Sequence, residues 1–237
     1  MIADRFAAGR YTVPVLYEDN HLLCVEKPPN LPVQADASGD MDLLTAAKAY
    51  IGAKYHKPGA VYLGLVHRLD RPVGGAVVLA RTGKAASRLS AQFAAHTVEK
   101  VYLAVLQGTL NGETRLVHWL LKNGATGMVS AVPETTPGAK RAELITRPLA
   151  VRGGLTLAEV ELLTGRAHQI RVQHREIGFP LWGDACYGGG KPGQQLALWA
   201  HRLTVQHPTL AKRVTFVSVP PEDGIWRNFE IDRLGRE

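Results

Sequence analysis

Residues 62–106 read YLGLVHRLDRPVGGAVVLARTGKAASRLSAQFAAHTVEKVYLAVL, and this stretch decides the fold class. Three short apolar runs, bounded by glycine or charged residues, predict strands at 62–66, 76–80 and 101–106. Between the second and third runs, apolar residues recur at every fourth position, which predicts a helix over 82–95 with Thr82 as its cap. The stretch therefore predicts two strands around a charged loop, followed by a helix and another strand.

The rest of the chain adds more strands than helices. We expect further strands at 13–17, 21–26, 155–163, 199–205 and 214–219, and hairpins between residues 108 and 154. Two more helices are expected, one over 42–55 with Asp40 as its cap and one over 165–178. Because helices do not alternate regularly with strands, the pattern predicts an α+β fold with a mixed or antiparallel sheet, and not a doubly wound parallel sheet.

The composition is that of a globular protein with a basic net charge. The chain has 237 residues, of which 46% are hydrophobic and 21% are charged, and this excludes a mainly disordered protein. Its formal charge of +7 favours a polyanion such as nucleic acid as the partner. The N-terminus lacks the apolar segment of a signal peptide, no run of 18 apolar residues occurs, and the two cysteines form no CxxC pair. We therefore expect a cytoplasmic protein.

The first candidate site is the charged loop Val66-His67-Arg68-Leu69-Asp70-Arg71-Pro72-Val73-Gly74-Gly75. Asp70 lies between Arg68 and Arg71, and nearby positive charge favours the ionised carboxylate. An ionised aspartate suits a nucleophile better than a general acid. A surface loop with a structural Asp–Arg pair is the alternative interpretation.

The second candidate site lies in residues 164–172, Thr-Gly-Arg-Ala-His-Gln-Ile-Arg-Val. Thr164 and the start of the expected helix would offer N–H donors to a phosphate. Arg166 and Arg171 are five residues apart, so they point about 140° apart on a helix and serve different purposes. A solvated basic helix face is the alternative.

Together these segments resemble the successive signatures of the RluA-type pseudouridine synthases. The resemblance rests on residues 67–71 (HRLDR), 100–102 (KVY) and 165–171 (GRAHQIR), together with 17–28 (YEDNHLLCVEKP), 178–184 (GFPLWGD) and Tyr187-Gly188. These pieces occur in the family's order from about residue 15 to residue 220. Val73-Gly74-Gly75 departs from the family's usual Thr-Ser-Gly.

The resemblance implies a mixed, bent sheet with helices around a basic cleft, and an isomerase that needs no cofactor. We expect no metal, because the sequence has no HxxxH motif or Cys/His cluster. It implies that Asp70 is the catalytic aspartate, Tyr102 the active-site tyrosine and Arg171 the arginine that pairs with Asp70. Arg68 resembles the residue that fills the gap left by a flipped base. With a lead-in over residues 1–12 and a single catalytic domain over 13–237, we expect no separate N-terminal RNA-binding domain and a monomer.

The implied substrate is a uridine in structured ribosomal or transfer RNA. Such a uridine must be flipped out of its helix before it reacts. Beside the catalytic residues, we expect RNA contacts from Arg68, Arg71, Lys84, Arg88, Arg166 and His168. Whether Asp70 attacks the sugar or the base stays open, as does the role of Tyr102 as a general base or as a ring packed under the uracil.

Two other functions compete with this interpretation. A catalytically silent RNA-binding module would share the scaffold but would not need Asp70, Tyr102 and Arg171. A glycoside hydrolase would normally need a second carboxylate beside Asp70, and neither motif contains one.

Overall fold

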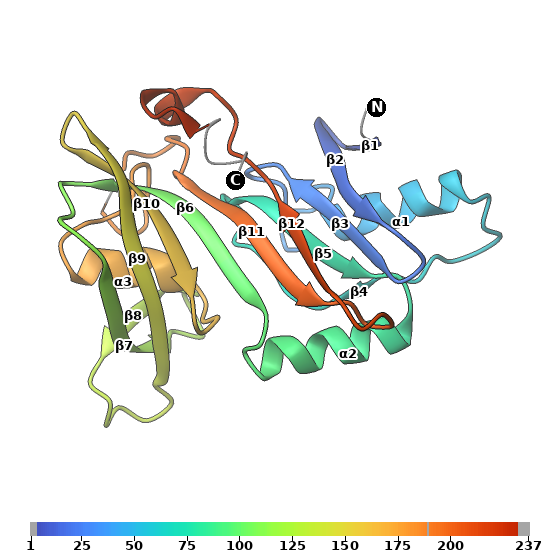
Figure 1. Ribbon diagram of the computed structural model, residues 1–237, viewed down its shortest axis with the longest axis horizontal. Helices are drawn as coiled ribbons and strands as arrows, with labels where there is room; N and C mark the ends of the chain where they lie inside the picture. The colour runs from blue at the N-terminus through green and yellow to red at the C-terminus, as the bar shows by residue number, and fades with distance from the viewer. Residues whose placement is uncertain (1–3, 189, 232–237) are drawn as a thin grey trace. The chain divides into compact units, whose positions relative to one another are not determined.

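The computed structural model describes residues 4–188 and 190–231 (Figure 1). Its contacts divide the chain into two compact units. Unit 1 comprises Met1–Glu99 and Ala200–Ser218, and unit 2 comprises Lys100–Trp199 and Val219–Glu237. The chain therefore leaves unit 1 after the 62–99 segment and returns to it for two late strands.

Unit 1 is a sheet with two helices. Its elements are β1 (Arg5–Ala8), β2 (Tyr11–Glu18), β3 (Leu22–Lys27), α1 (Leu43–Lys54), β4 (Gly64–Leu65), β5 (Gly74–Ala80), α2 (Gly83–Ala94), β11 (Leu198–Gln206, which begins in unit 2) and β12 (Arg213–Val217). The strand order is β1-β2-β3-β5-β11, with β4 paired to β5 and β12 paired to β11. All seven residues of β5 are buried, so this strand is the centre of the unit.

Unit 2 is a sheet of long antiparallel strands with one short helix. Its elements are β6 (Glu99–Gln107, whose first residue belongs to unit 1), β7 (Thr114–Lys122), β8 (Val129–Val132), β9 (Lys140–Arg152), β10 (Leu155–Leu162), α3 (Gln169–Glu176) and a 3-10 turn at Gly224–Asn228. The strand order is β6-β10-β9-β7-β8. One apolar cluster in this unit consists of Leu120, Val129, Ala142, Val172 and Tyr187, so α3 packs on the β7–β8–β9 part of the sheet.

The fold is α+β with a mixed sheet, as predicted, and the helix over 82–95 is confirmed. The hydroxyl of Thr82 accepts a hydrogen bond from the backbone of Ala85 and caps α2 as expected. The cap of α1 is Asp42 and not Asp40, because the Asp42 carboxylate accepts from the N–H of Thr45 at 2.9 Å. The basic cleft and the bend of the sheet stay predictions.

Two expectations for the ends of elements were wrong. Residues 5–8 form β1 and pair with β2, so the loose lead-in over residues 1–12 is wrong for this part. The helix expected from residue 165 begins only at Gln169. The Gln169 amide oxygen accepts from the N–H of Arg166 and from the hydroxyl of Thr164, and His168 has a left-handed backbone (φ 51°). These bonds hold 164–168 as a turn.

Candidate functional site

Asp70 lies in unit 1 on the loop between β4 and β5. The Asp70 side chain is half-buried, and the backbone carbonyl of Asp70 accepts from the N–H of Val73 at 3.0 Å to form a turn. Leu69 and Val73 are buried on either side of Asp70 and anchor the loop in the core. Gly75 has φ 116°, and a Cβ there would lie 2.3 Å from the carbonyl oxygen of Ala200, so only glycine fits at this position. The loop is therefore built to hold Asp70 in a fixed place.

A buried lysine holds this loop by hydrogen bonds to backbone carbonyls. The side chain of Lys27 is fully buried, and its Nζ donates to three carbonyl oxygens: Pro28 at 3.0 Å, Leu31 at 2.8 Å and Arg71 at 3.0 Å. Burial lowers the pKa of Lys27 to about 7, and the carboxylate of Asp70 opposes this shift. Lys27 thus joins the proline turn after β3 to the Asp70 loop.

This role of Lys27 was not predicted from the sequence, although a signal was present. Lys27 follows the apolar residues of β3 and precedes Pro28 and Pro29. Because proline has no backbone N–H, this part of the backbone offers carbonyls but few N–H donors. Such carbonyls need another donor when they are buried.

Arg71 does not flank Asp70 with its side chain, contrary to the sequence-based expectation. Its guanidinium forms ion pairs with Asp40 and with Asp36 and donates to the hydroxyl of Ser38 at 3.0 Å. The acidic loop over residues 36–40 is far from Arg71 in sequence, so the motif alone could not reveal this pairing. Arg71 contributes its backbone to the loop, through the carbonyl that binds Lys27. Arg68 is exposed to solvent.

Tyr102 lies in unit 2 on β6, opposite Val160 of β10. Its side chain is half-buried, whereas the neighbouring Leu103 is buried in an apolar cluster on the other face of the strand. Tyr102 is therefore not a core residue of that cluster, which was the alternative interpretation of its place in the strand pattern. Its two possible roles stay open.

Arg171, on α3 in unit 2, is buried in a bidentate ion pair with Asp184. Its Nε donates to one carboxylate oxygen at 2.7 Å and its Nη2 to the other at 2.8 Å. One of these oxygens also accepts from the backbone N–H groups of Cys186 and Tyr187. Gly183 (φ 77°), the residue before Asp184, lets the chain pass close to Gln195, because a Cβ there would lie 2.0 Å from the carbonyl oxygen of Gln195.

The Asp184 contact fixes the orientation of Arg171 by two parallel bonds. Asp184 lies in one of the segments that carry the resemblance, but no role was predicted for it from the sequence. Asp70 belongs to unit 1, so the pairing of Arg171 with Asp70, and the joint action of these residues with Tyr102, stay predictions.

Tyr187 links the remaining motif residues of unit 2. Its ring lies 4.9 Å from the guanidinium carbon of Arg171. Its hydroxyl accepts from the N–H of Val129 at 3.0 Å and forms a hydrogen bond with Nδ1 of His168 at 2.7 Å. His168, predicted to contact RNA, is therefore held in place by Tyr187. The Thr164 hydroxyl binds Glu143 and Gln169, and the helix begins later than expected, at Gln169. The phosphate site expected at Thr164 stays a prediction.

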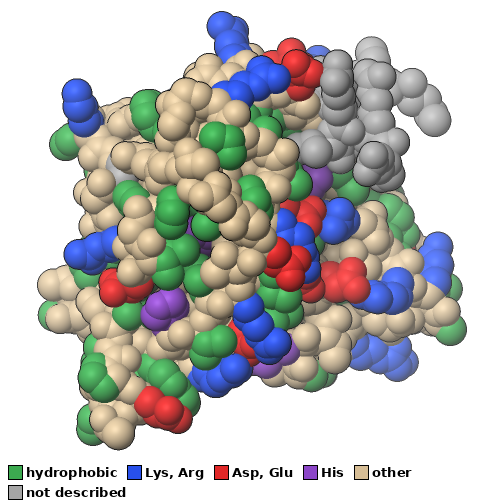
Figure 2. All heavy atoms as spheres, turned by 60° about the vertical axis from the view of Figure 1, so that its left-hand side comes forward, with side chains coloured by type: hydrophobic (Ala, Val, Ile, Leu, Met, Phe, Trp, Pro, Cys, Tyr) green, Lys and Arg blue, Asp and Glu red, His purple; other side chains and the backbone are tan. Residues whose placement is uncertain are grey.

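The other predicted RNA contacts differ in how available their charges are. Lys84 is exposed, and Arg88 donates to the carbonyl of Pro208. Arg166 donates from Nε to the carbonyl of Arg141 at 3.0 Å. On the face drawn in Figure 2, Lys and Arg side chains occur in several separate groups, some of them beside Asp and Glu. Charge alone therefore does not mark a single binding surface on this face.

No helix among the described residues combines the length and apolar character of a membrane span. Within residues 4–188 and 190–231, His, Cys, Asp and Glu side chains form no group of three or more that could hold a metal ion.

Comparison with known proteins gives one consistent family. A model of the family described as RNA pseudouridylate synthase matches residues 21–176. Ribosomal large subunit pseudouridine synthase D of Zymomonas mobilis is 33% identical over 221 residues, which cover 88% of this chain and 69% of that protein. Ribosomal large subunit pseudouridine synthase C of Vibrio cholerae is 32% identical over 209 residues, which cover 84% of this chain and 63% of that protein. The solved structure of human RNA pseudouridylate synthase domain containing 4 has a TM-score of 0.73 at 22% identity and covers 87% of this chain and 88% of that one.

Proposed function

Because the chain belongs to the RNA pseudouridylate synthase family, we propose that it converts a uridine of large-subunit ribosomal RNA to pseudouridine with Asp70 as the nucleophile. The observation that carries the proposal is the half-buried Asp70 on a turn anchored by buried neighbours, inside the segment that matches the family. The names of the bacterial relatives support ribosomal RNA over transfer RNA. Such a substrate would place the protein in the cytoplasm.

The reaction balances without a co-reactant. The bond between the sugar C1′ and N1 of uracil breaks, the detached uracil turns, and a new bond forms between C1′ and C5. The C5 proton is lost and N1 gains a proton, so no electrons enter or leave. An ionised Asp70 can hold one half of the nucleotide covalently while the other half turns.

Each remaining residue has a role that its surroundings support. Lys27 holds the Asp70 loop through three carbonyls and, in its protonated form, places a positive charge near the carboxylate. Arg171, oriented by Asp184, would keep Asp70 ionised. Tyr102 would move a proton or pack under the uracil. Arg68 would occupy the space left by the flipped uridine, whose extrusion costs a few kcal/mol.

The test is to map pseudouridine across total RNA from cells with and without the gene. We expect one or a few sites in large-subunit ribosomal RNA to lose pseudouridine, and the purified protein to restore them on a transcript of that RNA. If only transfer RNA sites change, the ribosomal assignment is wrong. If no site changes and the purified protein leaves every tested transcript unmodified, the proposed activity is wrong.

A further inference from the structure

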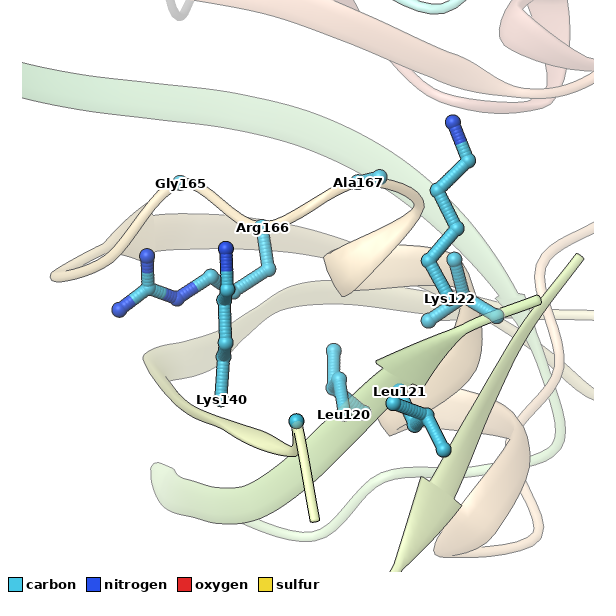
Figure 3. A pocket seen from close by; sticks show the side chains of 9 residues that line it. Leu120, Leu121, Lys122, Lys140, Gly165, Arg166 and Ala167 are labelled. Carbon is cyan, nitrogen blue, oxygen red and sulfur yellow. The ribbon is translucent and has the colours of Figure 1, made fainter. Parts of the chain in front are cut away.

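Unit 2 contains a pocket of about 350 Å³ that no part of the proposed reaction uses (Figure 3). It lies between the β7–β8 hairpin, the start of β9 and the turn that precedes α3. The residues that matter most to its chemistry are Leu120, Lys122, Val129, Lys140, Arg166 and Ala167. In Figure 3 the side chains of Lys122 and Lys140 extend to the same side of the sheet as that of Leu120, whereas the side chain of Leu121 extends to the other side. The two amino groups therefore stand over an apolar floor that includes Leu120 and not Leu121.

The strand register places the two lysines on the core-facing side of the sheet. Leu120 is opposite Lys140 on β9, and Lys122 is opposite Val129 on β8. Cross-strand partners, and residues two apart on one strand, point to the same face. Leu120 and Val129 are buried in the apolar cluster under α3, so both lysines extend from the edge of that cluster. A merely solvated lysine would more often lie on the opposite face of the sheet.

Arg166 completes a group of three positive charges around the pocket. Its position is fixed because its Nε donates to the carbonyl of Arg141, the residue next to Lys140. The turn that carries Arg166 is tied to β9, since the Gln169 amide donates to the carbonyl of Glu143 at 3.0 Å. The walls of the pocket are therefore held by hydrogen bonds before any ligand arrives.

Nothing in the described part of the chain neutralises these three charges. Across residues 4–188 and 190–231, no carboxylate lies within 4.0 Å of Lys122, Lys140 or Arg166. The nearby carboxylate of Glu143 is already paired with Arg115 and Arg141. Three like charges around a small pocket repel one another, and a bound anion would relieve that repulsion.

From this geometry we infer that the pocket binds one nucleotide of the substrate RNA, with its own and the adjoining phosphate on Lys140, Arg166 and Lys122 and its base against the apolar floor. The inference rests on the proposed function for the identity of the polyanion. The combination of cations and an apolar floor matches a nucleotide, because phosphate and base need these two surfaces. This nucleotide is not the reacting uridine, whose chemistry is assigned to Asp70. The pocket is therefore a second contact site, which strengthens RNA binding and fixes the position of the bound strand.

The test measures RNA binding, so it does not depend on turnover. All proteins carry Asp70→Asn, and the probe is a fluorescent transcript of large-subunit ribosomal RNA. Lys122→Gln with Lys140→Gln should weaken binding about tenfold and lower the log–log salt slope by roughly one to two. Lys57→Gln with Lys191→Gln is the matched control, since it removes the same charge from two exposed lysines outside the pocket. The control should change affinity less than about twofold.

A second measurement uses the unaltered protein. Acetylation of lysines with and without the transcript should show protection of Lys122 and Lys140 but not of Lys57 or Lys191. Equal losses in both double variants, or no protection of the pocket lysines, would overturn the inference. Protection by inorganic phosphate or uridine monophosphate at the same concentration of phosphate groups would overturn it as well, because the pocket would then bind free phosphate and not an RNA strand. If the binding and protection results are as predicted but the protein does not isomerise uridine, the inference about the pocket holds and the proposed function is wrong.

Discussion

Replacement of Asp184 by asparagine should destabilise the protein strongly, because the change removes the negatively charged partner of a buried ion pair. The side chains of Arg171 and Asp184 are 6% and 1% exposed, so the variant would keep the buried charge of Arg171 but lose the carboxylate that its Nε and Nη2 bind. The side-chain NH2 of the asparagine would also point at the Nε–H of Arg171, so two hydrogen-bond donors would face each other. Loss of one partner of a buried pair costs about 3–5 kcal/mol. For a chain of this size that corresponds to a drop in melting temperature of about 10 °C.

The matched control is Glu99→Gln, which breaks the ion pair with Arg213. That pair has a similar distance, 2.7 Å, but its side chains are 49% and 53% exposed. An exposed pair contributes at most about 1 kcal/mol, so the control should lose only about 2–4 °C. The assay is thermal unfolding followed by circular dichroism. Equal small losses in both variants would show that Asp184 does not hold Arg171 and would refute the reasoning.

Three further predictions concern the candidate catalytic groups. The pKa of Lys27 falls from 10.5 in the unfolded chain to about 7 in the folded one, so the unfolded chain binds more protons between these values and stability rises with pH. From pH 7 to pH 9 the free energy of unfolding in urea should increase by about 2 kcal/mol, an increase that Lys27→Met should abolish. Arg171→Lys should reduce the rate of isomerisation about 100-fold or more, since an ammonium cannot reproduce the two parallel hydrogen bonds of the planar guanidinium. A rate within about threefold of the wild type would contradict this role of Arg171. Tyr102→Phe should stop turnover if the hydroxyl moves a proton, whereas activity that survives in Phe but not in Tyr102→Ala would assign the ring to packing.

Local patterns in the sequence predicted most of the elements. The apolar run of β5 and the four-residue spacing in α2 each carry their own signal, because strand and helix burial have different periods. The start of α3 could not be predicted in this way. It depends on the side chain of Gln169, which folds back onto Thr164 and Arg166 and replaces a turn of helix with side-chain hydrogen bonds.

The sequence indicated which residues belong to the candidate site, but not which residues they contact. The motifs pointed to Asp70, Tyr102 and Arg171, and the family match covers all three positions. The pairing of Arg71 with Asp40 and the binding of Lys27 to the Asp70 loop join residues 31 and 44 positions apart in sequence. Such contacts depend on how loops meet in space, and a single sequence has no local pattern that reports this.

The most direct test of the central claim is the release of tritium from RNA labelled at C5 of uridine. Formation of the new carbon–carbon bond releases the C5 hydrogen, so release follows the isomerisation itself. We predict that the wild-type protein releases tritium from large-subunit ribosomal RNA, and that Asp70→Asn releases none while its RNA affinity stays within about tenfold of the wild type, because the substitution removes negative charge near phosphates. Substantial release by Asp70→Asn would contradict the assignment of Asp70 as the nucleophile.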